Sequence, residues 1–342
     1  MNRSSSGLAA IAAAIALCAC AHAPPGSTSG YKVGATYPLP GSGRWDLLAV
    51  DSTHHRVFIS RSDRVQVMDT GDGHLAGTID GTDGVHGIAI ATGLGRGFAT
   101  DGHASAVTEF DLGTLQRVRN IAVSGKSPDA VLFDTSSQRL FVFNARSNNA
   151  SVIDPATGEE VGTIAFDGNP ELGAADGAGH VFVNIEDKGQ LVDIDAGSMR
   201  ILHTWTLDGC EEPTGLAIDI AHARLFSACQ NRVMVVTDAR DGRQVARVGI
   251  DEGPDGAVFD PKSQTTFVPN GKSGTLTVIH EDDPSHFQVV QTLPTQRSAR
   301  TIALDFATHR LYLPAAEFGP QPADPDARPD MVPDSFRVLA VW

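Results

Sequence analysis

Two of the chain's four cysteines, Cys210 and Cys229, flank a segment whose residue types are suited to chemistry. They stand 19 positions apart in the stretch GCEEPTGLAIDIAHARLFSACQNR, and two adjacent acids, Glu211 and Glu212, follow the first of them. Thiols at this spacing are compatible with a disulfide, a soft-metal site or a reactive thiol pair. The choice depends on the compartment and on the elements that position these side chains.

The first residues of the chain indicate export from the cytoplasm. A single basic residue, Arg3, precedes an apolar run over 8–19. This run is too short for a permanent membrane span, but it suits the apolar region of a secretory signal. The run leads into Leu17-Cys18-Ala19-Cys20. A large aliphatic residue three positions before a cysteine, with a small residue just before it, resembles the bacterial lipobox.

The lipobox resemblance implies a lipid-anchored protein. In that family of signals the cysteine, here Cys20, is lipidated and becomes the mature N-terminus. We therefore expect a signal peptide over 1–19 and a flexible tether over 20–30, which is rich in Pro, Gly and Ser. The expected location is the periplasmic side of the cell envelope, at the outer membrane if the host is Gram-negative. Cleavage after Ala23, which would give a secreted protein, is the alternative.

This location favours a disulfide for the cysteine pair, because disulfides persist outside the cytoplasm. Cys18 would leave with the signal and Cys20 would carry lipid, so Cys210 and Cys229 are left as an even pair. We predict that these two are bonded and that the bond holds Glu212 and its neighbour in place. A soft-metal site is the less favoured alternative, because the one histidine between the cysteines is expected in a turn on the far side of the fold.

Seven copies of one unit fill the rest of the chain. A short apolar run centred on an aromatic residue recurs with spacings of 40 to 45 residues, starting at positions 57, 97, 140, 181, 225, 266 and 311. Each copy has another apolar run upstream and two more downstream, joined by Asp, Gly, Ser and Asn turn residues. This period, with four short strands per copy, is typical of a β-propeller blade.

We therefore predict an all-β, seven-bladed β-propeller over 31–342. The last copy lacks a fourth strand, whereas the stretch YKVGATYPL at 31–39 has the character of one. We expect this stretch to complete the last blade as its outermost strand. Such pairing of the two ends of the chain closes the ring and leaves only short sheet edges.

The repeats also resemble the YVTN-type repeat of YncE-like propeller proteins. The similarity is carried by DTSSQRLFVFN at 134–144, DIAHARLFSA at 219–228 and VIDPATGEEVGTI at 152–164. The resemblance implies a secreted or periplasmic seven-bladed propeller that binds something. It implies no fixed chemistry, because members of this architecture include passive binders, lactonases and lyases.

Two sets of loops should meet on one face of such a ring. They are the loops that enter the innermost strands, among them the loop with Asp46, and the loops between the second and third strands. Their polar residues should converge on one mouth, which is the default position for a binding site. The predicted ligand-binding residues are Arg44, Trp45, His103, Asp129, Asn144, Arg146, Asn184, Glu186, Glu212, Asp255 and Asn270.

The candidate catalytic residues, His86, Glu171 and Arg300, replace an aspartate that recurs in the strand-entry loops. In a lactonase- or lyase-type enzyme the arginine would steady a carboxylate or enolate, and the histidine or glutamate would move a proton. A second possibility is a Ca²⁺ or Mg²⁺ ion held by oxygen ligands, with Glu171, Glu186, Glu212 and Asp255 as candidates. A third is a partner surface with no small ligand.

Charge bears on the choice of partner. The formal net charge of −15 disfavours nucleic acid, because phosphate binding depends on clustered Lys and Arg. The segment 319–334 contains five prolines and is predicted to form an extended loop over the ligand face, as a lid or a partner-binding arm. We expect a monomer that acts as a binding or scaffolding protein for an envelope protein or a small polar ligand. Whether it is also an enzyme is left open.

Overall fold

Short antiparallel strands joined by tight turns make up nearly all of the structure. The structure is a computed structural model, and it describes Met1 and residues 30–324 and 327–342. The predicted signal peptide beyond Met1, the lipidation at Cys20 and the tether up to residue 29 lie outside the described residues. Residues 31–342 form one compact unit. Within the described ranges, no helix has the length and apolar character needed to cross a membrane.

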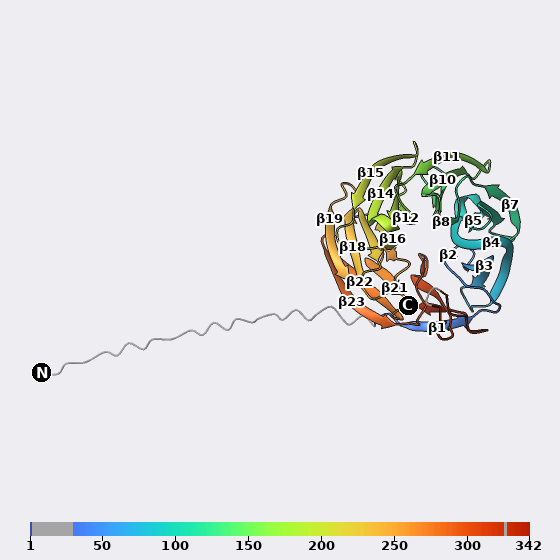
Figure 1. Cartoon of the computed structure of the whole chain (residues 1–342). Coiled ribbons are helices and arrows are strands. Elements are labelled where there is room, and N and C mark those ends of the chain that lie inside the picture. The colour runs from blue at the N-terminus through green and yellow to red at the C-terminus, as the bar shows by residue number, and fades with distance from the viewer. Residues whose placement is uncertain (2–29, 325–326) are drawn as a thin grey trace. The chain divides into compact units, whose positions relative to one another are not determined.

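The strands form six hydrogen-bonded sheets arranged in a ring (Figure 1). The largest sheet contains β2 (Leu48–Asp51), β3 (Arg56–Asp69), β4 (Leu75–Ala91), β5 (Arg96–Asp101), β6 (Ala106–Asp111) and β7 (Arg117–Ala122). The second contains β8 (Pro128–Asp134), β9 (Arg139–Asn144), β10 (Asn149–Asp154) and β11 (Glu159–Ala165). The third contains β12 (Pro170–Ala175), β13 (His180–Ile185), β14 (Gln190–Asp195) and β15 (Arg200–Thr206).

Three further sheets complete the ring. The fourth contains β16 (Pro213–Asp219), β17 (Arg224–Cys229), β18 (Val233–Asp238) and β19 (Gln244–Gly249). The fifth contains β20 (Val258–Asp260), β21 (Thr265–Asn270), β22 (Thr275–Asp283) and β23 (His286–Pro294). The sixth contains β24 (Ala303–Asp305), β25 (Arg310–Ala315), β26 (Arg337–Val341) and β1 (Val33–Pro38). Two 3₁₀ turns connect hairpin strands: η1 (Thr92–Leu94) joins β4 to β5, and η2 (Glu186–Lys188) joins β13 to β14.

The predicted number of blades is wrong, because the ring has six sheets and not seven. The first two sequence copies share the six-stranded sheet, since β3 and β4 are 14 and 17 residues long and carry the pairing from one copy into the next. Ser62 on β3 pairs with Val85 on β4, and Val85 pairs in turn with Asp101 on β5. The sequence period counts copies of the unit, and it does not reveal that two copies are joined by continuous strands.

The ends of the chain meet in the sixth sheet, as predicted for the stretch 31–39. Strand β1 pairs antiparallel with β26, with Tyr37 opposite Val338 and Val33 opposite Val341. The backbone of Lys32 continues the ladder through hydrogen bonds in both directions with Trp342. Because β1 is the outermost strand of this sheet, the N-terminal segment completes a sheet built from the C-terminal repeat.

The hydrophobic core lies between neighbouring sheets and accounts for the aromatic residue of each repeat. Every one of these rings is at most 1 % exposed: Phe58, Phe98, Phe141, Phe182, Phe226, Phe267 and Tyr312. Phe226 of β17 stacks on Phe259 of β20 with 5.4 Å between ring centroids, which joins the fourth sheet to the fifth. The repeated motif thus supplies the apolar burial that holds sheet to sheet.

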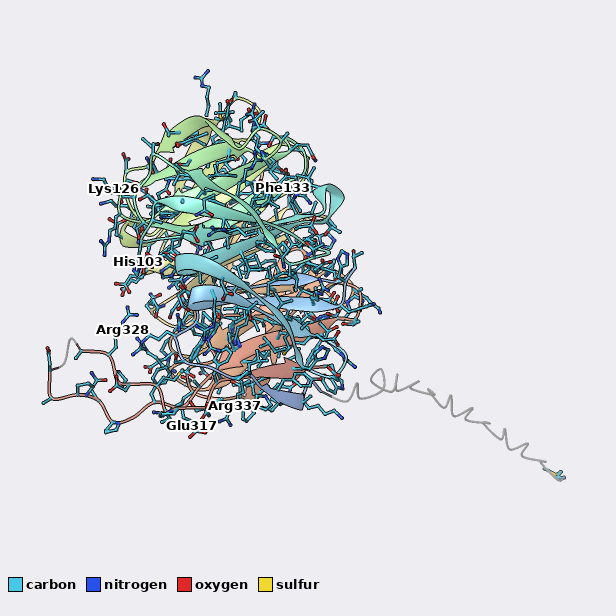
Figure 2. All side chains as sticks on the ribbon, turned by 90° about the vertical axis from the view of Figure 1, so that its right-hand side faces the viewer. His103, Lys126, Phe133, Glu317, Arg328 and Arg337 are labelled. Carbon is cyan, nitrogen blue, oxygen red and sulfur yellow. A yellow bond between two sulfur atoms is a disulfide. The ribbon has the colours of Figure 1, made fainter. Side chains whose placement is uncertain are left out.

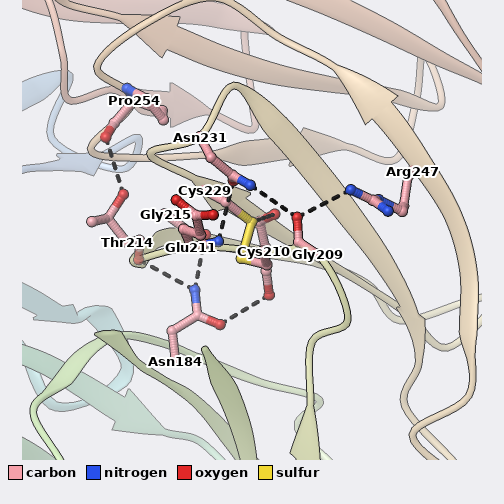
Figure 3. The surroundings of a disulfide bond; sticks show 11 residues. Asn184, Gly209, Cys210, Glu211, Thr214, Gly215, Cys229, Asn231, Arg247 and Pro254 are labelled. Carbon is pink, nitrogen blue, oxygen red and sulfur yellow. Dashed lines mark hydrogen bonds between the residues drawn. A yellow bond between two sulfur atoms is a disulfide. The ribbon is translucent and has the colours of Figure 1, made fainter. Parts of the chain in front are cut away.

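The predicted disulfide between Cys210 and Cys229 is present and buried (Figure 3). Pro213 pairs with Cys229, and an irregular register after Pro213 lets the preceding loop fold back to a Cα separation of 5.4 Å between the cysteines. Asn231 ties the same loop, because it accepts a hydrogen bond from Glu211 N and donates one to Gly209 O. The bond therefore fixes the loop that enters β16.

Candidate functional site

A pocket of about 640 Å³ opens where the loops that enter the innermost strands converge. We call it the mouth pocket. Its polar lining comes from loops and strand ends of every sheet except the fourth: Arg44, Asp46, Ser62, His86, His103, Asp129, Glu171, Asp255, Arg300 and Arg328. All three candidate catalytic residues are in this set. The structure thus brings His86, Glu171 and Arg300 together, although more than 200 residues separate the first from the last.

Arg300 occupies the centre of the polar network in the mouth pocket. Its Nε donates to Asp255 Oδ2 at 2.6 Å, and its Nη2 donates to Asp46 Oδ1 at 3.0 Å. The same Nη2 lies 3.3 Å from the carbonyl oxygen of Trp45. The guanidinium is therefore already held by two carboxylates of the protein itself.

His86 faces two other carboxylate oxygens. Its Nδ1 lies 2.6 Å from Asp46 Oδ2 and 3.5 Å from Asp129 Oδ1. A close approach of backbones makes this possible, because a Cβ on the neighbouring Gly87 would come within 2.4 Å of Asp129 O. The hydrogen bond with Asp46 raises the pKa of His86. Burial opposes ionisation of Asp46, but the bond with His86 and the charge of Arg300 outweigh it and lower the pKa of Asp46.

The remaining carboxylates of the mouth pocket are poorly compensated. Burial and then the charge of Asp46 raise the pKa of both Asp129 and Asp255 to about 6. Glu171 has no hydrogen-bond partner among the described residues, and burial together with the charges of Asp129 and Glu186 raises its pKa to about 10. These groups are surrounded by protein, yet the pocket lets water reach them. The deep part of the pocket therefore carries a strongly negative field.

The rim of the mouth pocket has the opposite character. Arg44 donates to the carbonyl oxygen of Pro329 at 2.5 Å, and its guanidinium lies 5.2 Å from the ring centroid of Phe318. Arg328 is exposed and stands on the proline-rich segment, which projects from the same face as His103, while Phe133 lies toward the opposite side (Figure 2). The segment predicted as an extended loop thus contributes Arg328 to the lining of the pocket.

Several predicted ligand-binding residues do not reach the mouth pocket. Asn144, Asn184 and Asn270 are fully buried, and their side-chain amides satisfy neighbouring groups of the sheets. Asn144 Nδ2 donates to Ser151 Oγ at 3.1 Å, and Asn270 Nδ2 donates to Thr277 Oγ1 at 2.9 Å. Asn184 Nδ2 donates to the carbonyl oxygen of Gly215 at 3.1 Å (Figure 3). Asn144 and Asn270 thus tie strands of their own sheets, whereas Asn184 ties the third sheet to the fourth.

The other displaced candidates lie beside the pocket. Arg146 is exposed, and its backbone N–H donates to Lys126 O. Glu186 begins η2, and its Oε2 accepts a hydrogen bond from Asn169 Nδ2 at 2.8 Å. Glu212 has a left-handed backbone with φ of 48° and stands in the disulfide loop. Arg44, Trp45, His103, Asp129 and Asp255 are the predicted ligand-binding residues that do line the pocket.

The carboxylates proposed for Ca²⁺ or Mg²⁺ are not gathered as one set. Among the described residues, three groups of ligand atoms lie within 4.8 Å of one another: Asp46 with His86 and Asp129, Asp69 with Asp72 and His74, and Asp219 with His222 and Glu281. None of the groups contains Glu171, Glu186, Glu212 or Asp255. Each group includes a histidine, whereas Ca²⁺ and Mg²⁺ prefer oxygen ligands alone.

Sequence reasoning placed Asp46 in an entry loop but gave it no role. In the structure the carboxylate of Asp46 links His86 to Arg300. Thr301 Oγ1 also donates to the backbone carbonyl oxygen of Asp46 at 2.7 Å. The signal in the sequence was its position next to Arg44 and Trp45, directly before an inner strand. Phe318 and Arg328 were missed because the inserted segment was predicted to cover this face as a whole, without a role for its individual side chains.

Comparison with known proteins shows the fold. No protein-family model matches the chain, and no curated protein matches it in sequence. Among solved structures, U3-55K matches with a TM-score of 0.75 and 10 % identity, over 91 % of this chain and 99 % of that one. The WD40 repeats of RRP9 match with a TM-score of 0.76 and 10 % identity, over 90 % and 97 %. The chain is a β-propeller.

A third solved structure matches this chain with a lower TM-score. A chain of the hydrazine synthase of Kuenenia stuttgartiensis matches with a TM-score of 0.68 and 16 % identity, over 84 % of this chain and 96 % of that one. At such identities the likeness establishes the architecture and carries no activity from one protein to another.

Proposed function

We propose that this propeller is a binding protein whose mouth pocket takes a small, positively charged ligand. The observation that carries the proposal is the set of carboxylates around the pocket. Asp46, Asp129, Glu171 and Asp255 line it, while its two deep cationic side chains, His86 and Arg300, are already engaged by Asp46. The carboxyl groups of Asp129 and Glu171 are left with the least compensation from these cationic side chains.

The field that acts on Glu171 supports this ligand class. Burial and the surrounding acids hold a proton on this side chain far above its ordinary range, with a pKa of about 10. A field that retains a proton also attracts other cations, such as an ammonium group or a metal ion, and pockets with low-dielectric walls focus this attraction. The volume of about 640 Å³ lies within the usual range for small-molecule sites.

The rim restricts the ligand further. Arg44 and Arg328 stand at the entrance, so a ligand whose outer end is neutral or anionic fits better than one that is cationic throughout. A zwitterion with its amine directed inward satisfies both the deep carboxylates and the rim arginines. The ring of Phe318, beside Arg44, offers an apolar contact in the same pocket.

Calorimetric titration of residues 31–342 with lysine, putrescine, Mg²⁺ and Ca²⁺ tests the proposal and separates amines from metal ions. Asp129→Asn should weaken binding by about tenfold or more, because a unit charge at contact distance contributes several kcal/mol in a partly buried site. Glu252→Gln is the matched control, since it removes an exposed carboxylate outside the pocket lining. Failure of every cation to bind would refute the proposal and favour a protein-docking face.

A second candidate function is catalysis of the lactonase or lyase type. It is favoured by the convergence of His86, Glu171 and Arg300 in one pocket, with Asp46 hydrogen-bonded to the histidine. Glu171 would supply the proton and His86 would accept one. Turnover of a lactone panel that disappears in both His86→Gln and Glu171→Gln would support this function. Equal turnover by the wild type and the variants would exclude it.

We also propose that the protein works outside the cytoplasm, as a YncE-like envelope component. The buried bond between Cys210 and Cys229 supports this location, because such bonds persist in oxidising compartments. Lipidation at Cys20 is the matching proposal for the anchor. Metabolic labelling with a fatty acid tests it: label in the wild type and none in Cys20→Ala would support the anchor, whereas equal label in both would refute it.

A further inference from the structure

A second cluster of titratable groups lies at the opposite ends of the inner strands from the mouth pocket. Asp219 is the last residue of β16, His222 stands in the turn that follows, and Glu281 belongs to β22 of the next sheet. His222 Nδ1 lies 2.6 Å from Asp219 Oδ2 and 2.8 Å from Glu281 Oε1. Two carboxylates from different sheets thus meet one imidazole.

An extended hairpin brings Glu281 to this position. Strand β22 has nine residues, whereas the corresponding third strands β10, β14 and β18 of other sheets have six. Its hairpin partner β23 also has nine residues. The extension leans onto the neighbouring sheet, where Arg224 Nε donates to the carbonyl oxygen of Pro284 at 2.7 Å. Glu281 N donates to Gln264 O at 2.9 Å, which fixes its backbone.

The first repeat provides an internal comparison. Asp51 and His54 form the same turn as Asp219 and His222, with the same separation of 2.6 Å between Nδ1 and the carboxylate. Among the described residues, Asp51 and His54 belong to none of the three groups whose atoms lie close enough together to hold a metal ion. The Asp–His pair is therefore what this turn forms by itself, and Glu281 is an addition that the turn does not require.

Glu281 is buried without adequate compensation. Its side chain is 1 % exposed, and neither oxygen accepts a properly oriented hydrogen bond from a described residue. Arg224 does not supply the missing donor, because it is paired with Asp238 at 2.9 Å and with backbone carbonyls. A buried carboxylate without a well-oriented donor is costly, and a cation bound beside it would offset that cost.

We propose that Asp219, His222 and Glu281 form a binding site for a divalent transition-metal ion, with Zn²⁺ as the best fit. One imidazole and two carboxylates are ligands that Zn²⁺ accepts, and their combined charge of −2 neutralises the ion. Because the side chain of His222 is 32 % exposed, water can reach a remaining coordination position. Ca²⁺ and Mg²⁺ fit less well, because the site includes a nitrogen donor.

The test is zinc stoichiometry and affinity on residues 31–342, measured by competition with a chromogenic chelator. We expect one Zn²⁺ per chain at this site, and Glu281→Gln should weaken its affinity by more than about tenfold, since even outer-shell partners of a metal contribute that much. His54→Gln is the matched control and should leave the affinity unchanged. Asp129→Asn reports on the Asp46–His86–Asp129 group in the mouth pocket and should also leave this site unchanged.

A second measurement on the wild type avoids dependence on the folding of any variant. Zn²⁺ should protect His222 against acylation by diethyl pyrocarbonate, as read from its peptide by mass spectrometry, while His54 stays reactive. Absence of zinc binding, equal protection of both histidines or loss of the ion only in Asp129→Asn would each overturn the proposal. His222 would then be a structural side chain that contacts the carboxylates of two sheets.

Discussion

Arg300 and Asp46 join the last sheet of the ring to the first, with 3.0 Å between Nη2 and Oδ1 across 254 positions of sequence. Arg300 also holds Asp255, in the loop before the fifth sheet, so one guanidinium links three neighbouring sheets at the mouth pocket. The pairing of β1 with β26 closes the ring at its outer edge, and this ion-pair network closes it on the inside.

Arg300→Met should destabilise the fold by about 1–3 kcal/mol, because it leaves Asp255 without its hydrogen-bond donor and Asp46 with His86 alone. Urea unfolding followed by tryptophan fluorescence measures the change. Arg232→Met is the control, because Arg232 lies 3.9 Å from Glu252 in an exposed ion pair of little expected value. Equal stability of the wild type and Arg300→Met would show that the network does not hold the sheets together.

Glu171→Gln should reduce the loss of stability at alkaline pH. A carboxyl group whose pKa rises from 4.5 to about 10 on folding holds a proton that the unfolded chain has released. The folded protein therefore loses stability relative to the unfolded chain as the pH rises from 4.5 toward 10. His86, whose pKa is also raised, loses its stabilising contribution in the same direction. Thermal midpoints at pH 6 and pH 9 measure the difference, which should be smaller in Glu171→Gln than in the wild type.

A control variant measured at the same two pH values separates the effect of Glu171 from general repulsion between like charges. The chain is strongly acidic, so any lost carboxylate reduces repulsion at high pH. Glu252→Gln removes an exposed carboxylate and should retain the wild-type pH dependence. If both variants respond alike, the field in the mouth pocket is not the cause.

Binding of putrescine to the mouth pocket should be tighter at pH 8 than at pH 5. The pKa of Asp129 and that of Asp255 are both raised to about 6, so both side chains gain their negative charge between these conditions. Alkyl amines resemble lysine and stay protonated over this range. Calorimetric titration at the two pH values is the measurement. Affinity that is independent of pH would contradict the role of these carboxylates.

Reduction of the bond between Cys210 and Cys229 should cost about 3 kcal/mol, the chain-entropy value for a closed loop of this length. Thermal unfolding with and without reductant measures it. The double variant Cys210→Ser, Cys229→Ser is the control and should not respond to reductant. A wild-type midpoint that reductant leaves unchanged would contradict the stabilising role of the bond.

Gly34→Val should weaken the closure of the ring by about 1–3 kcal/mol, the usual cost of overpacking. A Cβ at Gly34 would come within 2.1 Å of the ring of Trp342, so the indole must move. Gly249→Val is the matched control on another outer strand, because nothing lies within 4 Å of its Cβ position. Equal effects of the two variants on the urea midpoint would show that Trp342 is not held against β1.

The repeat period allowed the sequence to predict the propeller, because each unit buries the same aromatic ring between sheets. It could not predict six sheets, since the link between the first two copies depends on how far β3 and β4 continue. The convergence of His86, Glu171 and Arg300 followed from the loop order. The roles of Asn144, Asn184 and Asn270 did not, because a buried amide that ties strands or sheets together resembles a ligand-binding amide in sequence.

Contacts between sheets were the hardest to predict. The approach of Glu281 to His222 depends on the length of a hairpin from another repeat, and no local pattern encodes it. Asp46 likewise acquires its role only when the ends of the chain are joined. Both cases involve partners far apart in sequence, where the period of the repeat carries no information.

The position of β1 in the sixth sheet has a consequence for the order in which the fold can be completed. During synthesis β1 is among the first segments of the propeller to be made, and its partner β26 is the last. The intervening sheets can form as they emerge, since domains begin to fold during translation. The ring cannot close until β26 is available, so the first strand of the propeller stays unpaired while the strands of the other five sheets are made.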